Sequence, residues 1–209
     1  MEYRKNDIVT LEIVDCGTDG EGIGKADGFT VFVKDAVIGD IVTAKIMKAK
    51  KNYGYGRLME ILKPSPYRVE PVCPSARQCG GCQLQAVSYE EQKVFKEKKL
   101  RGHLERIGGF RDLPMEPMIG MDEPYHYRNK AQFPVGRNKE GRIITGFYAG
   151  RTHAIIENRD CALGIPQNKK ILDIVIAHME KYGIAPYDEM TGKGLVRHIF
   201  VRYGFFTGE

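Results

Sequence analysis

Short stretches in which apolar and polar residues alternate dominate residues 7–62. The alternating stretches are DIVTLEIVDC (7–16), FTVFV (29–33) and IVTAKIMKAK (41–50). Alternation with a period of two is typical of strands that bury one face. The intervening stretches are rich in glycine and aspartate, namely GTDGEGIGKADG (17–28) and IGD (38–40). Several short strands joined by such turns predict a small antiparallel barrel.

Two glycine-rich stretches invite comparison with nucleotide-binding loops. Gly20, Gly22 and Gly24 precede FTVFV, which has the pattern of a strand. A dinucleotide loop instead leads from a strand into a helix, so a glycine-rich hairpin is the better interpretation. The stretch TGKGLV (191–196) lacks the full P-loop spacing, and no mononucleotide site is predicted there.

Beyond the barrel, the sequence predicts a mixed α and β region. The stretch KPSPYRVEP (63–71) carries three prolines and is expected to link two modules. A helix is predicted from Ser88, where Ser88 and Glu91 form a capping box, to about Gly108. Its apolar stripe comprises Phe95, Leu100, Leu104 and Ile107, and its outer face is basic, with Lys93, Lys96, Lys98, Lys99 and Arg101. For that basic face alone, solvation is the favoured interpretation.

The second half of the chain predicts strands around one further helix. The expected strands are KAQFPVG (130–136), RIITGFYAG (142–150), HAIIEN (153–158) and a final one in which Leu195, Ile199 and Val201 alternate with Arg197 and Arg202. The helix is expected over 168–182, with Ile171, Val175, Met179 and Tyr182 on one face. The fold class is therefore α+β, mainly β.

Composition excludes few functions. The chain has 209 residues and a formal net charge of +5, which is compatible with a polyanionic partner without requiring one. No apolar run approaches the roughly 20 residues of a membrane span, and the charged start lacks the apolar core of a signal peptide. We therefore expect a cytoplasmic protein with no membrane partner. In that reducing setting, five cysteines indicate ligands, catalysts or core residues rather than a disulfide framework.

Three cysteines lie within VCPSARQCGGCQLQ (72–85), at Cys73, Cys79 and Cys82. Their C-x5-C-x2-C spacing suits a soft metal or an iron–sulfur cluster. A fourth ligand could be Cys16, in a predicted strand, or Cys161, in a turn-like stretch. A loop position suits a distant ligand better, which favours Cys161.

Two alternatives to an iron–sulfur cluster remain at this point. Cys79 and Cys82 could form a redox pair, although such pairs usually accompany a βαβ pattern that is missing here. Zinc sites typically combine two paired-ligand knuckles, whereas this arrangement has one knuckle with a lone cysteine on either side. That irregularity favours a [4Fe–4S] cluster.

The motif CPSARQCGGCQLQ resembles the cluster motif of the RNA (uracil-5-)-methyltransferases, in their iron–sulfur, 23S ribosomal RNA-like branch. Later stretches are similar to that family's signatures in the same order: YHYRNKAQFPV (125–135), GFYAGRTHAIIENRDC (146–161) and VRHIFVRYGFFTGE (196–209). The stretch DGEGIGKADGFTVFVKDAVIGD (19–40) is similar to the TRAM domain, an OB-like RNA-binding barrel.

This resemblance implies domains, cofactors and a reaction. Residues 1–63 would be the TRAM barrel and 64–209 an iron–sulfur central domain, whose helix 88–107 would pack on a catalytic domain. The cluster ligands would be Cys73, Cys79, Cys82 and Cys161, leaving Cys16 as a buried thiol. The family methylates carbon 5 of uracil with S-adenosylmethionine after a cysteine thiolate adds at carbon 6. In the family, the Rossmann-like domain, nucleophile and general base lie beyond the position of Glu209, so no catalytic residue is assigned and the chain alone is expected to be inactive.

The part of the enzyme that this chain represents would hold RNA. Clustered lysines supply charge for phosphates, and nearby tyrosines supply faces for unstacked bases. The candidate contacts are Lys45, Lys48, Lys50, Lys51, Tyr53, Tyr55, Arg128, Lys130, Arg197 and Arg202.

The expected target is 23S ribosomal RNA, bound by a monomer. A transfer RNA uracil-5-methyltransferase is an alternative within the same chemistry. The rival class is a stand-alone RNA-binding or iron–sulfur redox protein that transfers no methyl group.

Overall fold

The computed structural model describes residues 3–209. It divides into two compact units. Unit 1 comprises Met1–Pro71 and Gln83–Gly120, and unit 2 comprises Val72–Cys82 and Met121–Glu209. Met1 and Glu2, which the expected barrel domain 1–63 includes, lie outside the described residues. The chain thus enters unit 2 at Val72, returns to unit 1 at Gln83 and enters unit 2 again at Met121.

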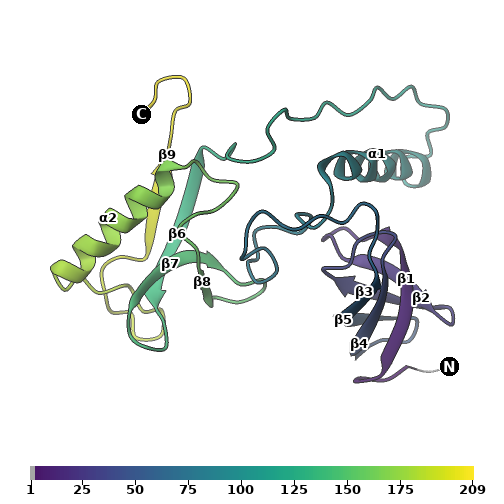
Figure 1. The fold of residues 1–209 in the computed structure, drawn as a ribbon, viewed down its shortest axis with the longest axis horizontal. Coiled ribbons are helices and arrows are strands. Elements are labelled where there is room, and N and C mark those ends of the chain that lie inside the picture. The colour runs from purple at the N-terminus through teal and green to yellow at the C-terminus, as the bar shows by residue number, and fades with distance from the viewer. Residues whose placement is uncertain (1–2) are drawn as a thin grey trace. The chain divides into compact units, whose positions relative to one another are not determined.

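Unit 1 contains a closed five-stranded barrel with the strand order β1-β2-β3-β5-β4 (Figure 1). Its strands are β1 (Ile8–Cys16), β2 (Gly22–Ala26), β3 (Phe29–Lys34), β4 (Ile41–Ala49) and β5 (Tyr53–Lys63). The barrel was expected to be antiparallel throughout, but β3 and β5 pair in parallel, with Phe32 opposite Tyr55. This one parallel pair closes the barrel, because β5 pairs with β4 on its other side.

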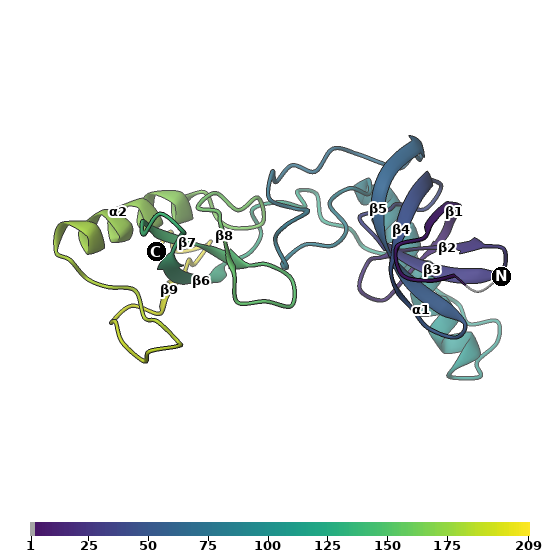
Figure 2. The ribbon, with the colours of Figure 1, turned by 90° about the horizontal axis from the view of Figure 1, so that it is seen from below.

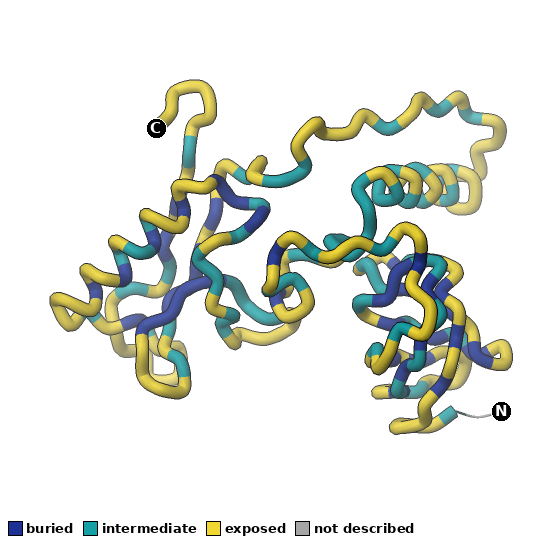
Figure 3. The backbone as a smooth tube through the Cα atoms, in the orientation of Figure 1, coloured by how far each residue is buried: buried dark blue, intermediate teal, exposed yellow. Residues whose placement is uncertain are grey.

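The predicted alternation builds the barrel core. Buried residues alternate with more exposed ones from Val9 to Ile13 in β1 and from Phe29 to Val33 in β3. Figure 3 shows the buried segments of the barrel in dark blue. The glycine-rich stretch is a strand that pairs with both β1 and β3, which confirms the hairpin interpretation. Close packing explains one of its glycines, because a side chain at Gly24 would collide with Leu11 and with the backbone of Glu12.

The segment after β5 is fixed to the barrel by Asp40, although it was expected to be a linker. The Asp40 side chain is fully buried and lies 2.5 Å from the Arg68 guanidinium. It also accepts hydrogen bonds from the backbone N–H groups of Val37 (2.7 Å) and Ser65 (2.8 Å). Burial alone would raise the pKa of Asp40, but hydrogen bonds from Arg68 and from these two N–H groups lower it.

Helix α1 (Tyr89–Arg106) starts where the sequence predicts, with Ser88 as its N-cap. The Ser88 hydroxyl accepts a hydrogen bond from the backbone N–H of Glu91 (3.4 Å). The reciprocal half of the predicted capping box is missing, because the Ser88 N–H donates to the carbonyl of Tyr67 instead (2.9 Å). No residue of α1, which lies wholly within the described part of the chain, is fully buried.

Unit 2 is a four-stranded sheet with α2 (Gln167–Lys181) packed on one face, as Figures 1 and 2 show. The strand order is β8-β7-β6-β9, and all neighbours are antiparallel. These strands are β6 (Lys130–Arg137), β7 (Ile143–Tyr148), β8 (Ile155–Glu157) and β9 (His198–Arg202). Phe133 on β6 and Leu172 on α2 are fully buried in the shared core.

Helix α2 presents a slightly different face to the sheet from the one predicted. Leu172, Ile176 and Met179 are buried, whereas Tyr182 is 59% exposed and lies just past the end of the helix. The predicted stripe was thus offset by about one residue, because Ile171 and Val175 lie at the edge of the core. Leu195, predicted to lie in the last strand, precedes β9 and is exposed.

Within residues 3–209, no helix is long and apolar enough to cross a membrane. The cytoplasmic location expected from the sequence stays a prediction.

Candidate nucleic-acid interface and cysteine loop

The first four residues of β5 are Tyr-Gly-Tyr-Gly, and they alternate between the outer and inner faces of the barrel. Tyr53 and Tyr55 are exposed, whereas Gly54 and Gly56 point into the barrel and are buried. A Cβ atom at Gly56 would lie 3.0 Å from Val31 and 3.2 Å from Ala44, so the interior has little room there. The strand therefore packs closely inside while presenting two aromatic rings outside.

Three aromatic rings form a cluster on the outside of the barrel, defined here as the aromatic cluster: Phe32, Tyr53 and Tyr55. The ring centroids of Phe32 lie 5.9 Å from Tyr53 and 5.6 Å from Tyr55, and the two tyrosine centroids are 5.9 Å apart. Sequence reasoning named the tyrosines and missed Phe32. Alternation in FTVFV carried the necessary signal, because Phe29 and Val31 face inward and Phe32 therefore faces outward.

Cationic residues flank the aromatic cluster in register. Lys48 on β4 lies opposite Tyr55, and Lys45 lies opposite Arg57 on β5. Arg57 also lies opposite Lys34 on β3. The predicted Lys50 and Lys51 are exposed at the turn between β4 and β5. The barrel thus brings together all six residues predicted for this region and adds Phe32, Lys34 and Arg57.

A second aromatic and cationic group lies on the sheet of unit 2. Lys130 and Arg202 are opposite each other on β6 and β9. The Lys130 ammonium and the Arg202 guanidinium each lie 5.8 Å from the ring centroid of Phe200, which is 56% exposed. Both cations were predicted RNA contacts, and Phe200 was missed.

The two other predicted arginines have different surroundings. The Arg197 guanidinium lies 2.7 Å from the Glu189 carboxylate, which raises the pKa of Arg197 and balances its charge. It also lies 5.6 Å from the centroid of the Tyr187 ring. The backbone N–H of Arg128 donates to the carbonyl of Leu163 (2.9 Å), next to the cysteine-bearing loops.

The four cysteines predicted as ligands all belong to unit 2, whereas Cys16 ends β1 in unit 1. Cys73 and Cys79 are buried, and Cys82 and Cys161 are half-buried. Tight turns shape the first loop, where the N–H of Cys79 donates to the carbonyl of Ser75 (2.8 Å). The N–H of Gly80 then donates to the carbonyl of Tyr148 at the end of β7 (3.0 Å).

Two of the cysteine sulfurs accept hydrogen bonds from nitrogen donors. The Gly81 N–H lies 3.3 Å from the Sγ atom of Cys79, and the Asn158 side-chain amide lies 3.4 Å from that of Cys73. Burial raises the pKa of the Cys79 thiol, the Gly81 N–H opposes that shift, and the charges of Cys161 and Cys73 add to it. The charges of Cys161 and Cys73 therefore both act on the Cys79 thiol.

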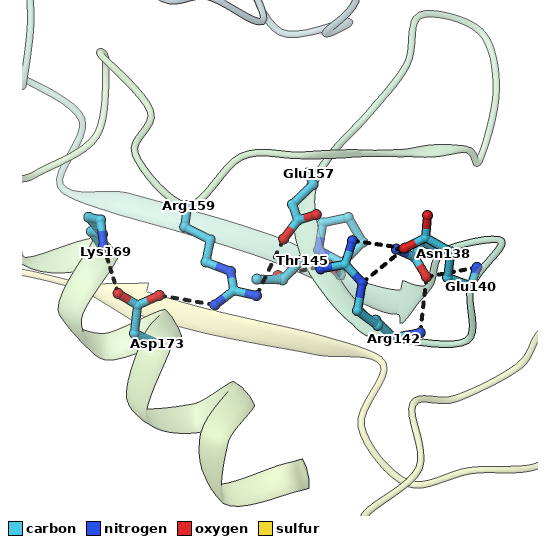
Figure 4. A network of polar contacts seen from close by, with 9 residues as sticks. Asn138, Glu140, Arg142, Thr145, Glu157, Arg159, Lys169 and Asp173 are labelled. Atoms are coloured by element: carbon cyan, nitrogen blue, oxygen red, sulfur yellow. Dashed lines mark hydrogen bonds and ion pairs between the residues drawn. The ribbon is translucent and has the colours of Figure 1, made fainter.

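The stretch that carries Cys161 is held by an ion-pair network between β8 and α2, which Figure 4 shows. Arg159 lies 3.0 Å from Asp173 on α2 and 3.3 Å from Glu157 on β8. Lys169 lies 2.8 Å from the same Asp173, and the two cations lower the pKa of that carboxyl. This network fixes the backbone two residues before Cys161.

The donor set suits an iron–sulfur cluster by its chemistry, because four soft thiols lie in one unit and N–H groups point at two of the sulfurs. Within residues 3–209, however, no three His, Cys, Asp or Glu side chains are arranged to hold a metal ion. The match between these four cysteines and an iron–sulfur cluster therefore rests on the chemistry of the thiols and on their common location in unit 2.

Cys16 has surroundings of its own. It was expected to be a buried thiol, but it is half-buried. Burial raises the pKa of its thiol to about 11, the Asp15 charge adds to the shift, and Lys99 opposes it.

The barrel with its outward aromatic and cationic rows matches a known domain. Residues 4–59 match the TRAM domain. The likeness to TRAM noted over 19–40 is thereby confirmed and extended to most of the barrel.

Two curated relatives cover the whole chain or nearly so. A protein of Clostridium tetani named "Uncharacterized RNA methyltransferase" is 46% identical over 209 residues, which is 100% of this chain and 45% of the relative. A protein of Halalkalibacterium halodurans with the same description is 45% identical over 206 residues, which is 99% of this chain and 45% of the relative. The chain is similar to these two proteins over nearly all of its own length, and it spans about 45% of theirs.

A solved structure shares the fold. The crystal structure of the Pyrococcus abyssi tRNA (uracil-54, C5)-methyltransferase in complex with S-adenosyl-L-homocysteine matches with a TM-score of 0.67 at 24% identity. The match covers 95% of this chain and 44% of that one.

Proposed function

We propose that this chain is the RNA-recognition part of an S-adenosylmethionine-dependent RNA uracil-C5 methyltransferase. The observation that carries the proposal is the aromatic cluster with cations in register beside it. Lys48 lies opposite Tyr55, and Phe32 lies opposite Tyr55 on the other side. Stacking platforms bordered by cations are how proteins bind single-stranded nucleic acid, since bases stack on rings while phosphates pair with cations.

The methyl group would come from S-adenosylmethionine bound by another part of the enzyme. No catalytic residue is proposed within residues 1–209, and the inactivity of the chain alone stays a prediction. The role proposed for this chain is to bind and orient the RNA, so that the target base reaches a catalytic pocket elsewhere.

We further propose that Cys73, Cys79, Cys82 and Cys161 hold a [4Fe–4S] cluster. Three observations support this proposal. The four residues supply thiol ligands, N–H groups are directed at the Cys73 and Cys79 sulfurs, and the ion pairs of Arg159 hold the stretch before Cys161. Such a cluster, when bound, would tie the loop 72–82 to the stretch after β8. A structural role of this kind agrees with the position of the cysteines on loops rather than on strands.

Helix α1 has exposed apolar residues that could contact the rest of the enzyme. Leu100 is 50% exposed and Ile107 is 81% exposed, although both belong to the predicted apolar stripe. The relatives are more than twice as long as this chain. We therefore propose, as the sequence suggested, that this stripe of helix 88–107 packs on the catalytic domain.

The proposed RNA target is 23S ribosomal RNA, and transfer RNA is the alternative. The decisive measurement is the mass of RNA fragments from cells with and without the full gene. Loss of a methyl group from a uridine in 23S ribosomal RNA supports the proposal, and loss from transfer RNA supports the alternative. Unchanged RNA in both would favour the rival class, a stand-alone RNA-binding or redox protein.

Binding of RNA by this chain is tested by its dependence on salt. Each phosphate contact in a single strand contributes about 0.7 to the slope of log affinity against log salt. Replacing Lys48, Lys50 and Lys51 together by Gln should lower that slope by about 2. The matched control replaces three exposed lysines of unit 2 by Gln: Lys139, Lys170 and Lys193. Equal slopes for the two triple variants would place the contact surface off the barrel, and absence of RNA binding would refute the proposal.

A further inference from the structure

A cavity of about 270 Å³ lies inside unit 1, between the barrel and α1. Residues at the end of β1 and on β2 and β3 form one wall, and α1 forms the other. The lining includes Cys16, Phe32, Phe95, Lys98, Lys99 and Arg106. Ligand pockets for drug-sized molecules are about 300–1,000 Å³, so this cavity, just below that range, has room for at most one nucleotide and excludes a duplex.

The cavity adjoins the aromatic cluster, because Phe32 belongs to both. On the opposite wall Phe95 presents a second ring. Both phenylalanines are half-buried, so each still has ring surface to offer. A strand of RNA that stacks on Tyr53 and Tyr55 would meet the mouth of this cavity at Phe32.

Cations outnumber anions around the cavity. Lys98, Lys99 and Arg106 all come from α1, and the seven-residue spacing of Lys99 and Arg106 places those two on the same helix face. Lys99 lies 5.7 Å from the centroid of the Phe95 ring, and neither Lys98 nor Lys99 forms an ion pair within residues 3–209. Among the described residues of the lining, Asp15 is the one carboxylate, and it accepts a hydrogen bond from the backbone N–H of Cys16 (2.9 Å).

We propose that this cavity binds one nucleotide of single-stranded RNA, with the base between Phe32 and Phe95 and its phosphate beside Lys98, Lys99 and Arg106. The inference rests on the proposed function, since it adds a nucleotide subsite to the same RNA-binding surface. It also gives the basic side of α1 a role, where the sequence alone favoured solvation. Phe95, which belongs to the predicted apolar stripe, lines the cavity, so this proposal limits the surface left for the catalytic domain to Leu100, Leu104 and Ile107.

The first test measures affinity for a fluorescent single-stranded RNA of about eight nucleotides, within the site size of comparable barrels. Phe95→Ala should weaken binding about ten-fold, because one stacking surface is lost. Lys98→Gln should lower the salt slope by about 0.7. Lys96→Gln is the matched control, since Lys96 is an exposed cation of the same helix outside the lining. Circular dichroism and urea unfolding establish that each variant is folded.

The second test uses Cys16 as a reporter inside the cavity. Its alkylation by iodoacetamide is followed peptide by peptide with mass spectrometry, at one fixed pH. Saturating RNA should slow alkylation of Cys16 several-fold in the native chain and much less in Phe95→Ala. Uridine monophosphate serves as a separate probe, because a free nucleotide shares the chemistry of one RNA residue.

The outcomes separate this inference from the function on which it rests. Tight RNA binding with unprotected Cys16 and with equal slopes for Lys96→Gln and Lys98→Gln overturns the cavity and leaves RNA binding standing. Absence of RNA binding overturns both. Protection by uridine monophosphate but not by RNA overturns the RNA subsite and identifies a free-nucleotide site instead.

Discussion

The Asp40 carboxylate lies fully buried 2.5 Å from the guanidinium of Arg68, 28 residues along the chain. Arg68 also donates to the carbonyl of Asp35 (2.9 Å), so one side chain joins the turn before β4 to the segment after β5. A buried carboxylate is stable only when its oxygens are paired, and here Val37, Ser65 and Arg68 supply the donors.

Replacing Arg68 by Ala should destabilise unit 1 strongly. The change leaves Asp40 buried without its counter-charge, which typically costs about 3–5 kcal/mol. Urea unfolding followed by tyrosine fluorescence measures the loss. Lys63→Ala, which removes an exposed cation at the end of β5, should change stability by less than about 0.5 kcal/mol. Similar losses in both variants would show that the ion pair contributes little.

The same pair predicts how stability depends on pH. Because the folded state lowers the pKa of Asp40, the unfolded chain binds more protons in the acid range, and stability rises with pH there. The contribution is complete above the unfolded pKa of about 3.9 and is lost as the pH falls further. Urea midpoints from pH 6 to pH 3 should therefore converge for the native chain and Asp40→Asn. A constant difference between the two would contradict the assignment.

The aromatic cluster should contribute to RNA affinity through stacking. Tyr55→Ala and Phe32→Ala should each weaken binding of single-stranded RNA about ten-fold, while the salt slope stays the same. Fluorescence anisotropy at several salt concentrations separates these two effects. Tyr182→Ala is the control, because Tyr182 is an exposed tyrosine in unit 2, and this change should leave RNA affinity and salt slope unaltered. A loss of slope instead of affinity would mean that the rings only position nearby cations.

The cysteines give a prediction with a built-in control. Anaerobically purified protein should contain about four irons per chain. Cys161→Ser should lose most of this iron, whereas Cys16→Ser should retain it, because Cys16 belongs to the other unit. Elemental analysis and visible absorption provide the readout. One zinc and no iron would refute the cluster, and iron loss in Cys16→Ser alone would mean that the fourth ligand was misassigned.

Local patterns in the sequence predicted most of the elements. The period-two alternation located β1, β3 and β4, and Ser88 located the start of α1, because these signals depend on neighbours in the chain. Tyr53 and Tyr55 were visible as an aromatic pair beside lysines. The alternation in FTVFV places Phe32 on the outer face, but its contact with Tyr55 comes from the parallel pairing of β3 with β5, which no local pattern reveals.

Long-range contacts also account for the other differences. The sequence predicts that the N–H of Ser88 completes a capping box with Glu91. In the fold this N–H donates to the carbonyl of Tyr67 instead. In the sequence Asp40 looks like an ordinary turn residue, and its ion pair with Arg68 is visible only in the fold. The cavity beside α1 involves residues of β1, β3 and α1 that are far apart in sequence, so only the folded chain brings them together.

The Asp40–Arg68 pair makes the stability of the barrel depend on residues beyond its last strand. A protein ending at Lys63 would retain all five strands and every residue of the aromatic cluster, yet Asp40 would lose both Ser65 and Arg68. A barrel cut at Lys63 should therefore be less stable than one that extends to Arg68, because the buried Asp40 carboxylate keeps only the Val37 N–H as a partner. The segment after β5 thus stabilises the barrel through the contacts of Ser65 and Arg68 with Asp40.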